Sequence, residues 1–94
     1  MITRVVKMHF REAACADFEK LFSTRQAGIQ KMPGCHSVQL LKATGEAGIY
    51  FTISLWDDEA SLEQYRASAF FKETWKATRA LFAGKAEAWS LSAL

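Results

Sequence analysis

The stretch IYFTISLWDDEASLEQY, residues 49–65, contains the change of pattern that decides the fold. Its first eight residues alternate between two sets of side chains, as in a strand that presents different residues on its two faces. Asp57, Asp58 and Glu59 then place carboxylates where a helix begins, at the positive end of the helix dipole. We therefore expect a strand over residues 49–56 that leads directly into a helix.

Outward from this stretch, alternating apolar and polar residues predict three further strands. They cover residues 2–10, 36–42 and 86–92. The strand over residues 36–42 is separated from the strand over residues 49–56 only by a short glycine-containing segment, so we expect these two strands to form a hairpin.

Helical spacing of apolar residues predicts the remaining elements. One helix begins near residue 12 and ends before Pro33 and Gly34, because proline cannot continue a helix. Another helix is capped by Ser68 and closed by Gly84. The order β-α-β-β-α(α)-β predicts an α+β, ferredoxin-like domain over residues 1–94, with a four-stranded antiparallel sheet and helices on one face.

The face of the sheet that no helix covers is a candidate association surface, since exposed apolar patches mark interaction sites. By alternation we place Val5 and His9 of the first strand on this face, and Tyr50, Thr52, Ser54 and Trp56 of the third. We expect Val5, His9, Tyr50, Ser54 and Trp56 to form the interface of a two-fold homodimer.

Composition excludes several classes of protein. Hydrophobic residues make up 50% and charged residues 23% of 94 residues, and the net charge is +2, so we expect neither a nucleic-acid partner nor a membrane span. The opening Met1-Ile2-Thr3-Arg4 lacks a signal pattern, so we expect a cytoplasmic protein. Cys15 and Cys35 have no metal-ligand spacing and are interpreted as thiols, with no metal site.

The chain resembles the antibiotic biosynthesis monooxygenase (ABM) family of dimeric α/β barrels. The resemblance is carried by residues 2–10, 32–35 and 53–62 together with Tyr65, Ser68, Phe71, Lys72 and Trp75. It implies a small dimer with a pocket between sheet and helices. Some members oxygenate aromatic polyketides, hydroquinones or anthrones with dioxygen and no cofactor, whereas others degrade haem or isomerise small metabolites.

The resemblance disfavours haem degradation. Haem-degrading relatives have an iron-ligating histidine where this chain has Trp75, an asparagine where it has Val6 and a tryptophan where it has Tyr65. Trp75 lacks the histidine nitrogen that ligates iron, and Val6 lacks the asparagine nitrogen that forms a hydrogen bond. We therefore expect a cofactor-independent monooxygenase acting on a reduced aromatic or quinol-like small molecule.

The candidate site combines aromatic side chains with a few polar ones. We assign catalytic roles to Tyr65 and Trp75, which could donate hydrogen bonds to a substrate oxygen, and to His36, which could act as a base at the rim. Arg25 or Arg4 would stabilise an anion if either points inward. The predicted substrate-binding residues are Val6, Met8, Phe51, Ile53, Phe71, Phe82 and Arg25.

Two other functions remain open. Since no predicted pocket residue is an obvious base, the protein could be a non-catalytic dimeric binding protein for a hydrophobic small molecule or haem. An isomerase of the same fold would need a histidine or an acid inside the pocket. Phe71 and Phe82 are also compatible with a plain hydrophobic core, because aromatic residues at helical spacing usually pack there.

Overall fold

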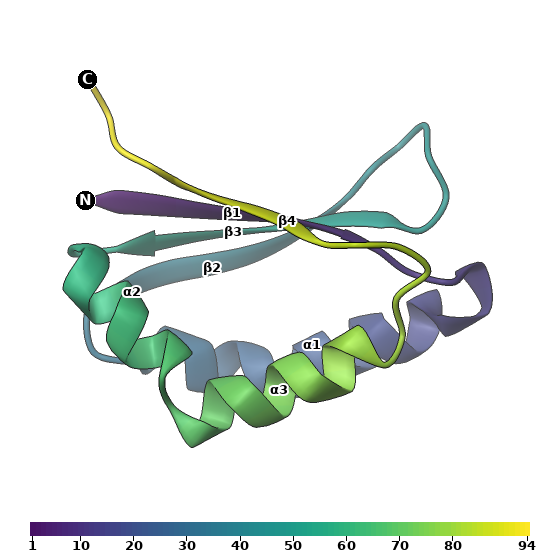
Figure 1. Ribbon diagram of the computed structural model, residues 1–94, viewed down its shortest axis with the longest axis horizontal. Coiled ribbons are helices and arrows are strands. Elements are labelled where there is room, and N and C mark those ends of the chain that lie inside the picture. Colours follow the sequence, from purple (N-terminus) through teal and green to yellow (C-terminus); the bar gives the residue numbers. More distant parts are fainter.

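A four-stranded antiparallel sheet forms one layer of the protein in the computed structural model, which describes residues 1–94 (Figure 1). The strand order is β2-β3-β1-β4, so the first and third strands occupy the centre. This order is that of the ferredoxin-like arrangement and confirms the predicted fold class. The strands are β1 (Ile2–His9), β2 (Cys35–Lys42), β3 (Ile49–Trp56) and β4 (Glu87–Leu91).

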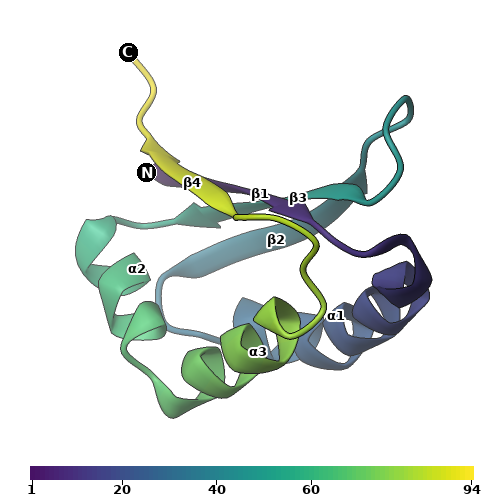
Figure 2. The same cartoon turned by 45° about the vertical axis from the view of Figure 1, so that its right-hand side comes forward.

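All helices lie on the same side of the sheet and form the second layer (Figures 1 and 2). A short 3-10 turn, η1 (Glu12–Ala14), follows β1 and leads into α1 (Cys15–Gln30). This helix packs under the sheet and connects β1 to β2 along the chain (Figure 1). After β3 come α2 (Glu59–Arg66) and α3 (Ala69–Arg79). The other face of the sheet carries no helix. None of the helices has the length and apolar character needed to cross a membrane.

Side-chain caps fix where α2 and α3 begin, as the sequence predicts. The Ser61 backbone N–H donates to Asp58 Oδ1 over 2.8 Å, and the Phe71 backbone N–H donates to Ser68 Oγ over 3.1 Å. Each cap satisfies an N–H that has no partner within the helix. The two helices are therefore separate and are joined by a tight turn at Ala67 and Ser68.

The predicted end of the last helix at Gly84 is wrong, because α3 ends at Arg79. Beyond it the chain forms hydrogen bonds with the end of β1 instead of continuing the helix. The Arg11 N–H donates to the Leu81 carbonyl over 3.1 Å, and the Ala83 N–H donates to the His9 carbonyl over 2.8 Å. These bonds hold the connection to β4 against the sheet.

The predicted faces of β3 are also wrong, and the pairing register shows why. Met8 pairs with Tyr50 and Val6 with Thr52, so the even-numbered residues of β3 share the helix-covered face with Val6 and Met8. Tyr50 and Trp56 are 1% and 0% exposed. Phe51 and Ile53 consequently lie on the open face, whereas Tyr50, Thr52, Ser54 and Trp56 lie beneath the helices.

Hydrogen bonding and ring size explain this choice of face. The Trp56 indole N–H donates to Ser54 Oγ over 2.9 Å, and the Tyr50 hydroxyl donates to the Glu19 carboxylate. The largest side chains of the strand are thus buried with their polar atoms satisfied. The odd-numbered residues are apolar as well, and alternation alone cannot distinguish two apolar faces.

The open face of the sheet carries apolar residues on all four strands, among polar residues of β1 and β2 such as Lys7, His9 and Gln39. Val5 and His9 of β1 belong to it by alternation with Met8, as predicted, and Val5 pairs with Ile53 on one side and Trp89 on the other. Trp89 and Leu91 are 43% and 49% exposed in the single chain. The apolar residues of this face are Val5, Leu41, Ile49, Phe51, Ile53, Leu55, Trp89 and Leu91.

Candidate functional site

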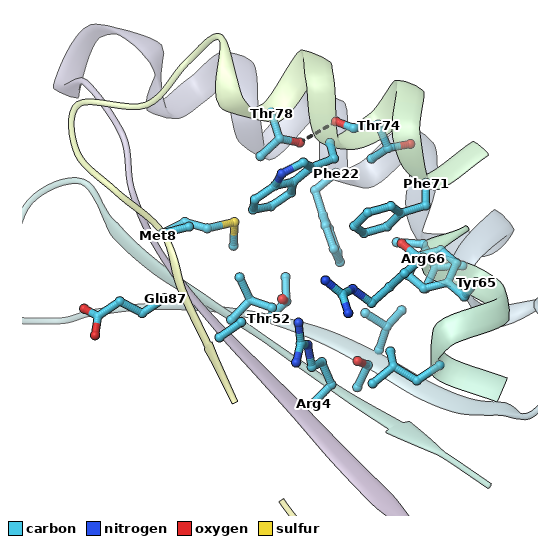
Figure 3. Close-up of a pocket in the computed structure, with 18 of the residues that line it drawn as sticks. Arg4, Met8, Phe22, Thr52, Tyr65, Arg66, Phe71, Thr74, Thr78 and Glu87 are labelled. Atoms are coloured by element: carbon cyan, nitrogen blue, oxygen red, sulfur yellow. Dashed lines mark hydrogen bonds between the residues drawn. The ribbon is translucent and has the colours of Figure 1, made fainter. Parts of the chain in front are cut away.

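A cavity of about 370 Å³ lies between the helix-covered face of the sheet and helices α2 and α3 (Figure 3). Its volume falls within the usual range of small-molecule sites. Every strand and every α-helix contributes to its lining. Of the predicted site residues, the structure brings five together around it: Val6, Met8, Tyr65, Phe71 and Trp75.

The helical wall of the cavity is a row of aromatic rings. Tyr65 stacks on Trp56 with ring centres 5.0 Å apart and meets Phe71 edge-on, also at 5.0 Å. Phe71 and Trp75 follow with nearly parallel rings 6.1 Å apart. Rings held by one another in this way form a rigid apolar wall, which suits a flat aromatic ligand.

Tyr65 and Trp75 bring polar hydrogens to this apolar wall. Whereas Tyr50 and Trp56 donate to partners within the protein, the Tyr65 hydroxyl and the Trp75 indole N–H have no partner in the chain. Burial raises the pKa of Tyr65 to about 12, with a smaller contribution from Cys35. Tyr65 therefore keeps its proton at neutral pH and can donate a hydrogen bond to a ligand oxygen.

Hydroxyl groups line the cavity from the strands and from α3. Thr52 and Ser54 project from β3, and Ser54 accepts the Trp56 hydrogen bond. Thr78 donates to the Thr74 carbonyl over 2.7 Å, as Figure 3 shows. Thr74 Oγ1 is buried without a hydrogen-bond partner. The lining thus has a mixed character, apolar over most of its area with scattered hydroxyls.

Two guanidinium groups reach the cavity from different elements. Arg4 extends from β1 and Arg66 from α2, and in Figure 3 both point toward its centre. Arg4 Nη1 donates to Ser90 Oγ over 3.0 Å, and Arg66 Nη1 lies 2.8 Å from Glu63 Oε1. Burial lowers the pKa of Arg4 below its ordinary value, and the charge of Arg66 lowers it further while Glu63 opposes the shift.

The structure places five predicted site residues outside the cavity. His36, at the start of β2, is exposed, and its Nε2 lies 2.5 Å from Asp57 Oδ1. The prediction that His36 rims the pocket is wrong, because this pairing and the irregular register of β2 between Cys35 and Ser37 hold it at the surface. Phe51 and Ile53 are on the open face, as described above.

Arg25 and Phe82 are the other two predicted site residues that lie outside the cavity, and both pack against aromatic rings. The Arg25 guanidinium lies 5.6 Å above the Phe70 ring, where α1 and α3 meet, and does not reach the cavity. Phe82 packs edge-on against Trp75 and Phe10, with ring centres 5.6 and 5.2 Å away. Phe82 thus supports the aromatic wall from behind.

Arg66 and the hydroxyl residues are lining residues that the sequence-based prediction missed. Arg66 follows Tyr65 on a short helix and has the appearance of an ordinary surface residue of its last turn. Thr52 was assigned to the wrong face of β3. The even-numbered position of Arg4 on β1, among Val6 and Met8, is the one signal in the sequence that indicates a charged group on this face.

The cavity contains no histidine, and Glu87 is its one acidic lining residue. The Glu87 carboxylate points away from the two guanidinium groups in Figure 3. No three His, Cys, Asp or Glu side chains lie close enough together to hold a metal ion. Cys15 and Cys35 are free thiols, and burial raises the pKa of Cys35. No group pointing into the cavity therefore has the character of a general base.

These features define an α+β protein of the ferredoxin-like class with an aromatic cavity between sheet and helices. The family model for antibiotic biosynthesis monooxygenases matches residues 1–77, and the chain belongs to this family. No protein with a curated description matches the chain.

Solved structures of similar fold include monooxygenases. A candidate antibiotic biosynthesis monooxygenase from Caulobacter crescentus CB15 is 28% identical with a TM-score of 0.92, covering 99% of this chain and 89% of its own. SnoaB from Streptomyces nogalater, a cofactor-independent oxygenase whose structure is that of a mutant form, is 26% identical with a TM-score of 0.86, covering 98% and 91%. A conserved protein from Methanosarcina mazei Go1 shares the fold at 23% identity and a TM-score of 0.89, covering 97% and 91%.

Proposed function

We propose that the protein is a cofactor-independent monooxygenase that oxygenates a reduced, electron-rich aromatic molecule of the anthrone or hydroquinone type. The observation that carries the proposal is the cavity itself: a stacked aromatic wall that places two unpartnered donors, Tyr65 and Trp75, beside an apolar space. Membership of the ABM family and the similarity to SnoaB support this reading.

The chemistry asks little of the protein beyond binding and hydrogen bonding. An anthrone-type carbon that has lost its proton to solvent gives one electron to dioxygen, and recombination of the carbon radical with superoxide followed by reprotonation forms a hydroperoxide. Loss of water then leaves a ketone, so that CH₂ and O₂ become C=O and H₂O. The Tyr65 hydroxyl and the Trp75 indole N–H would stabilise the substrate oxygen that carries the negative charge, and the apolar walls would exclude water.

Dimerisation through the open face of the sheet belongs to the same proposal. This face carries an uncovered apolar patch that runs from Trp89 and Leu91 at one edge to Leu41 at the other. Packing it against the same face of a second copy would remove the patch from water and form the α/β barrel. A cytoplasmic location stays a prediction from the sequence.

One observation favours a second function. A cavity whose lining holds no histidine and no inward-pointing carboxylate also suits a non-catalytic protein that binds a hydrophobic small molecule. Its ligand would bind without being consumed.

Dioxygen uptake separates the two functions. Metal-stripped protein is assayed against a panel of anthrones and hydroquinones, and we expect uptake above the autoxidation background. Tyr65→Phe removes one donor from the cavity and should lower kcat/KM about tenfold. Tyr50→Phe is the matched control, since the Tyr50 hydroxyl is bonded to Glu19 outside the cavity. Uptake that is equally reduced in both variants, or absent with every substrate, would contradict the proposal.

A further inference from the structure

We propose that Arg4 and Arg66 form an anion subsite that selects aromatic ligands carrying an ionised oxygen group, a carboxylate or a phenolate. The inference rests on the proposed function in taking the cavity as the ligand site, and it adds the chemical class of the ligand. It assigns to β1 and α2 a role separate from that of the aromatic wall.

The position of the two side chains carries the argument. Arg4 shares the helix-covered face of β1 with Val6 and Met8, and Arg66 stands at the last residue of α2, next to Tyr65. Both line the same cavity, and their guanidinium groups point into it (Figure 3). Like charges that approach one another in a partly buried space are unfavourable unless an anion lies between or beside them.

The charges around the pair leave one positive charge unbalanced. Glu63 is the one carboxylate in contact with the pair, and it binds Arg66. The partner of Arg4 is the neutral Ser90 hydroxyl. Glu87, the remaining acidic residue of the lining, points away. An anionic oxygen group would supply the missing charge.

The geometry of guanidinium suits this ligand chemistry. Its planar fork donates two parallel hydrogen bonds to a carboxylate and remains charged at every physiological pH. In a cavity with no general base, a ligand whose reacting group is already ionised as a phenolate also needs no proton removed by the protein. The aromatic part of the ligand would then lie along Tyr65, Phe71 and Trp75.

Isothermal titration calorimetry with two probes of the same shape tests the subsite. Naphthoate carries the anionic group, and naphthamide replaces it with a neutral amide. We expect the wild-type protein to bind naphthoate about tenfold more tightly than naphthamide, as a charge-assisted hydrogen bond predicts. Added salt should weaken naphthoate binding more than naphthamide binding.

Three variants locate the effect. Arg4→Gln and Arg66→Gln should each remove most of the preference for naphthoate and leave naphthamide affinity within about twofold, which also shows that the variant is folded. Arg79→Gln, an exposed residue in the last turn of α3, should change neither affinity. Equal binding of the two probes by wild type, no binding of naphthoate at millimolar concentration, or parallel loss of both probes in the variants would overturn the subsite.

The subsite and the oxygenase can fail separately. Naphthoate binding that depends on the two arginines, in a protein that consumes no dioxygen with any substrate, would contradict the oxygenase and leave the subsite intact. Oxygen uptake by a protein that shows no preference between the probes would contradict the subsite alone.

Discussion

The two faces of the central strand β3 differ in chemistry although they are built from alternate residues of the same chain. The helix-covered face mixes rings with hydroxyls, whereas the open face is wholly apolar. On the covered face are Tyr50, Thr52, Ser54 and Trp56, and on the open face are Ile49, Phe51, Ile53 and Leu55.

This difference separates two kinds of surface. The hydroxyls and rings of the covered face border a cavity, where a ligand with polar groups finds hydrogen-bond partners. The open face offers no side-chain donor or acceptor along β3 and suits contact with another apolar surface. We therefore propose that the sheet binds a small molecule on one side and a second copy of the chain on the other.

The largest expected effect comes from placing a charge in the centre of the open face. Ile53→Glu sets a carboxylate between Val5 and Gln39, its neighbours on β1 and β2. In a two-fold dimer the charge is buried without a partner in each copy, so dimer affinity should fall by about 100-fold or more.

Sedimentation velocity measures this change directly. The wild-type protein should sediment as a dimer and Ile53→Glu as a monomer. Ala77→Glu, an exposed position on α3 away from the open face, serves as the control and should remain dimeric. A wild-type monomer at micromolar concentration would refute the role assigned to the open face.

Neighbouring residues of β3 should respond differently to substitution. Trp56→Phe leaves a void beneath the helices and removes the donor to Ser54, so the free energy of unfolding should fall by about 2–3 kcal/mol at every protein concentration. For Leu55→Ala the free energy of unfolding should fall by less than this in dilute protein. Because Leu55 lies on the open face, the loss should grow as protein concentration rises and dimers form. Urea unfolding at several protein concentrations checks both, and an equal, concentration-independent loss would contradict the assignment of faces.

Alkaline pH should destabilise the covered face. Burial raises the pKa of Tyr65 to about 12, and burial together with the Glu19 hydrogen bond raises the pKa of Tyr50. The folded protein therefore holds tyrosine protons that the unfolded chain releases near pH 10, so this stability is complete below about pH 10 and is lost as pH rises toward about 12.

Two measurements test this pH dependence. Tyrosinate absorbance of the folded protein should stay absent near pH 10, where unfolded protein already ionises. The loss of unfolding free energy above that pH should be about 1–3 kcal/mol smaller in Tyr65→Phe than in wild type. Tyrosinate absorbance emerging near pH 10 in the folded protein would be inconsistent with a buried Tyr65.

The smallest effect concerns the helix that carries the aromatic wall. Ser68→Ala removes the side-chain acceptor of the Phe71 N–H and should lower the unfolding free energy by about 1 kcal/mol. Ser23→Ala, at an exposed position within α1, should change it by less. Thermal unfolding monitored by circular dichroism compares the two, and an equal effect would indicate that the Ser68 cap contributes little.

The sequence predicted the elements of this fold because local signals mark them. The carboxylate of Asp58 and the hydroxyl of Ser68 cap helices in the structure as their positions indicate. Alternation in β1 was sufficient to assign its faces, since Lys7 and His9 contrast with Val6 and Met8. Alternation in β3 was not, because Phe51 and Ile53 are as apolar as Tyr50 and Trp56, and only the register with β1 distinguishes them.

The site residues that follow helical spacing of aromatic side chains were predictable from the sequence. Those whose position depends on contacts between distant segments were not. Tyr65, Phe71 and Trp75 line the cavity as expected. His36 does not, since Asp57, distant in sequence, holds it at the surface. Arg66 joins the site because the turn of α2 brings it opposite Arg4, a relation between distant segments that no local pattern records.

A crystal structure of the protein with bound naphthoate would test the division between the two faces most directly. We predict that the naphthyl ring lies along Tyr65, Phe71 and Trp75 with its carboxylate between Arg4 and Arg66. Two copies should meet through the open faces of their sheets. Naphthoate bound on the open face, or a carboxylate turned away from both arginines, would contradict this division.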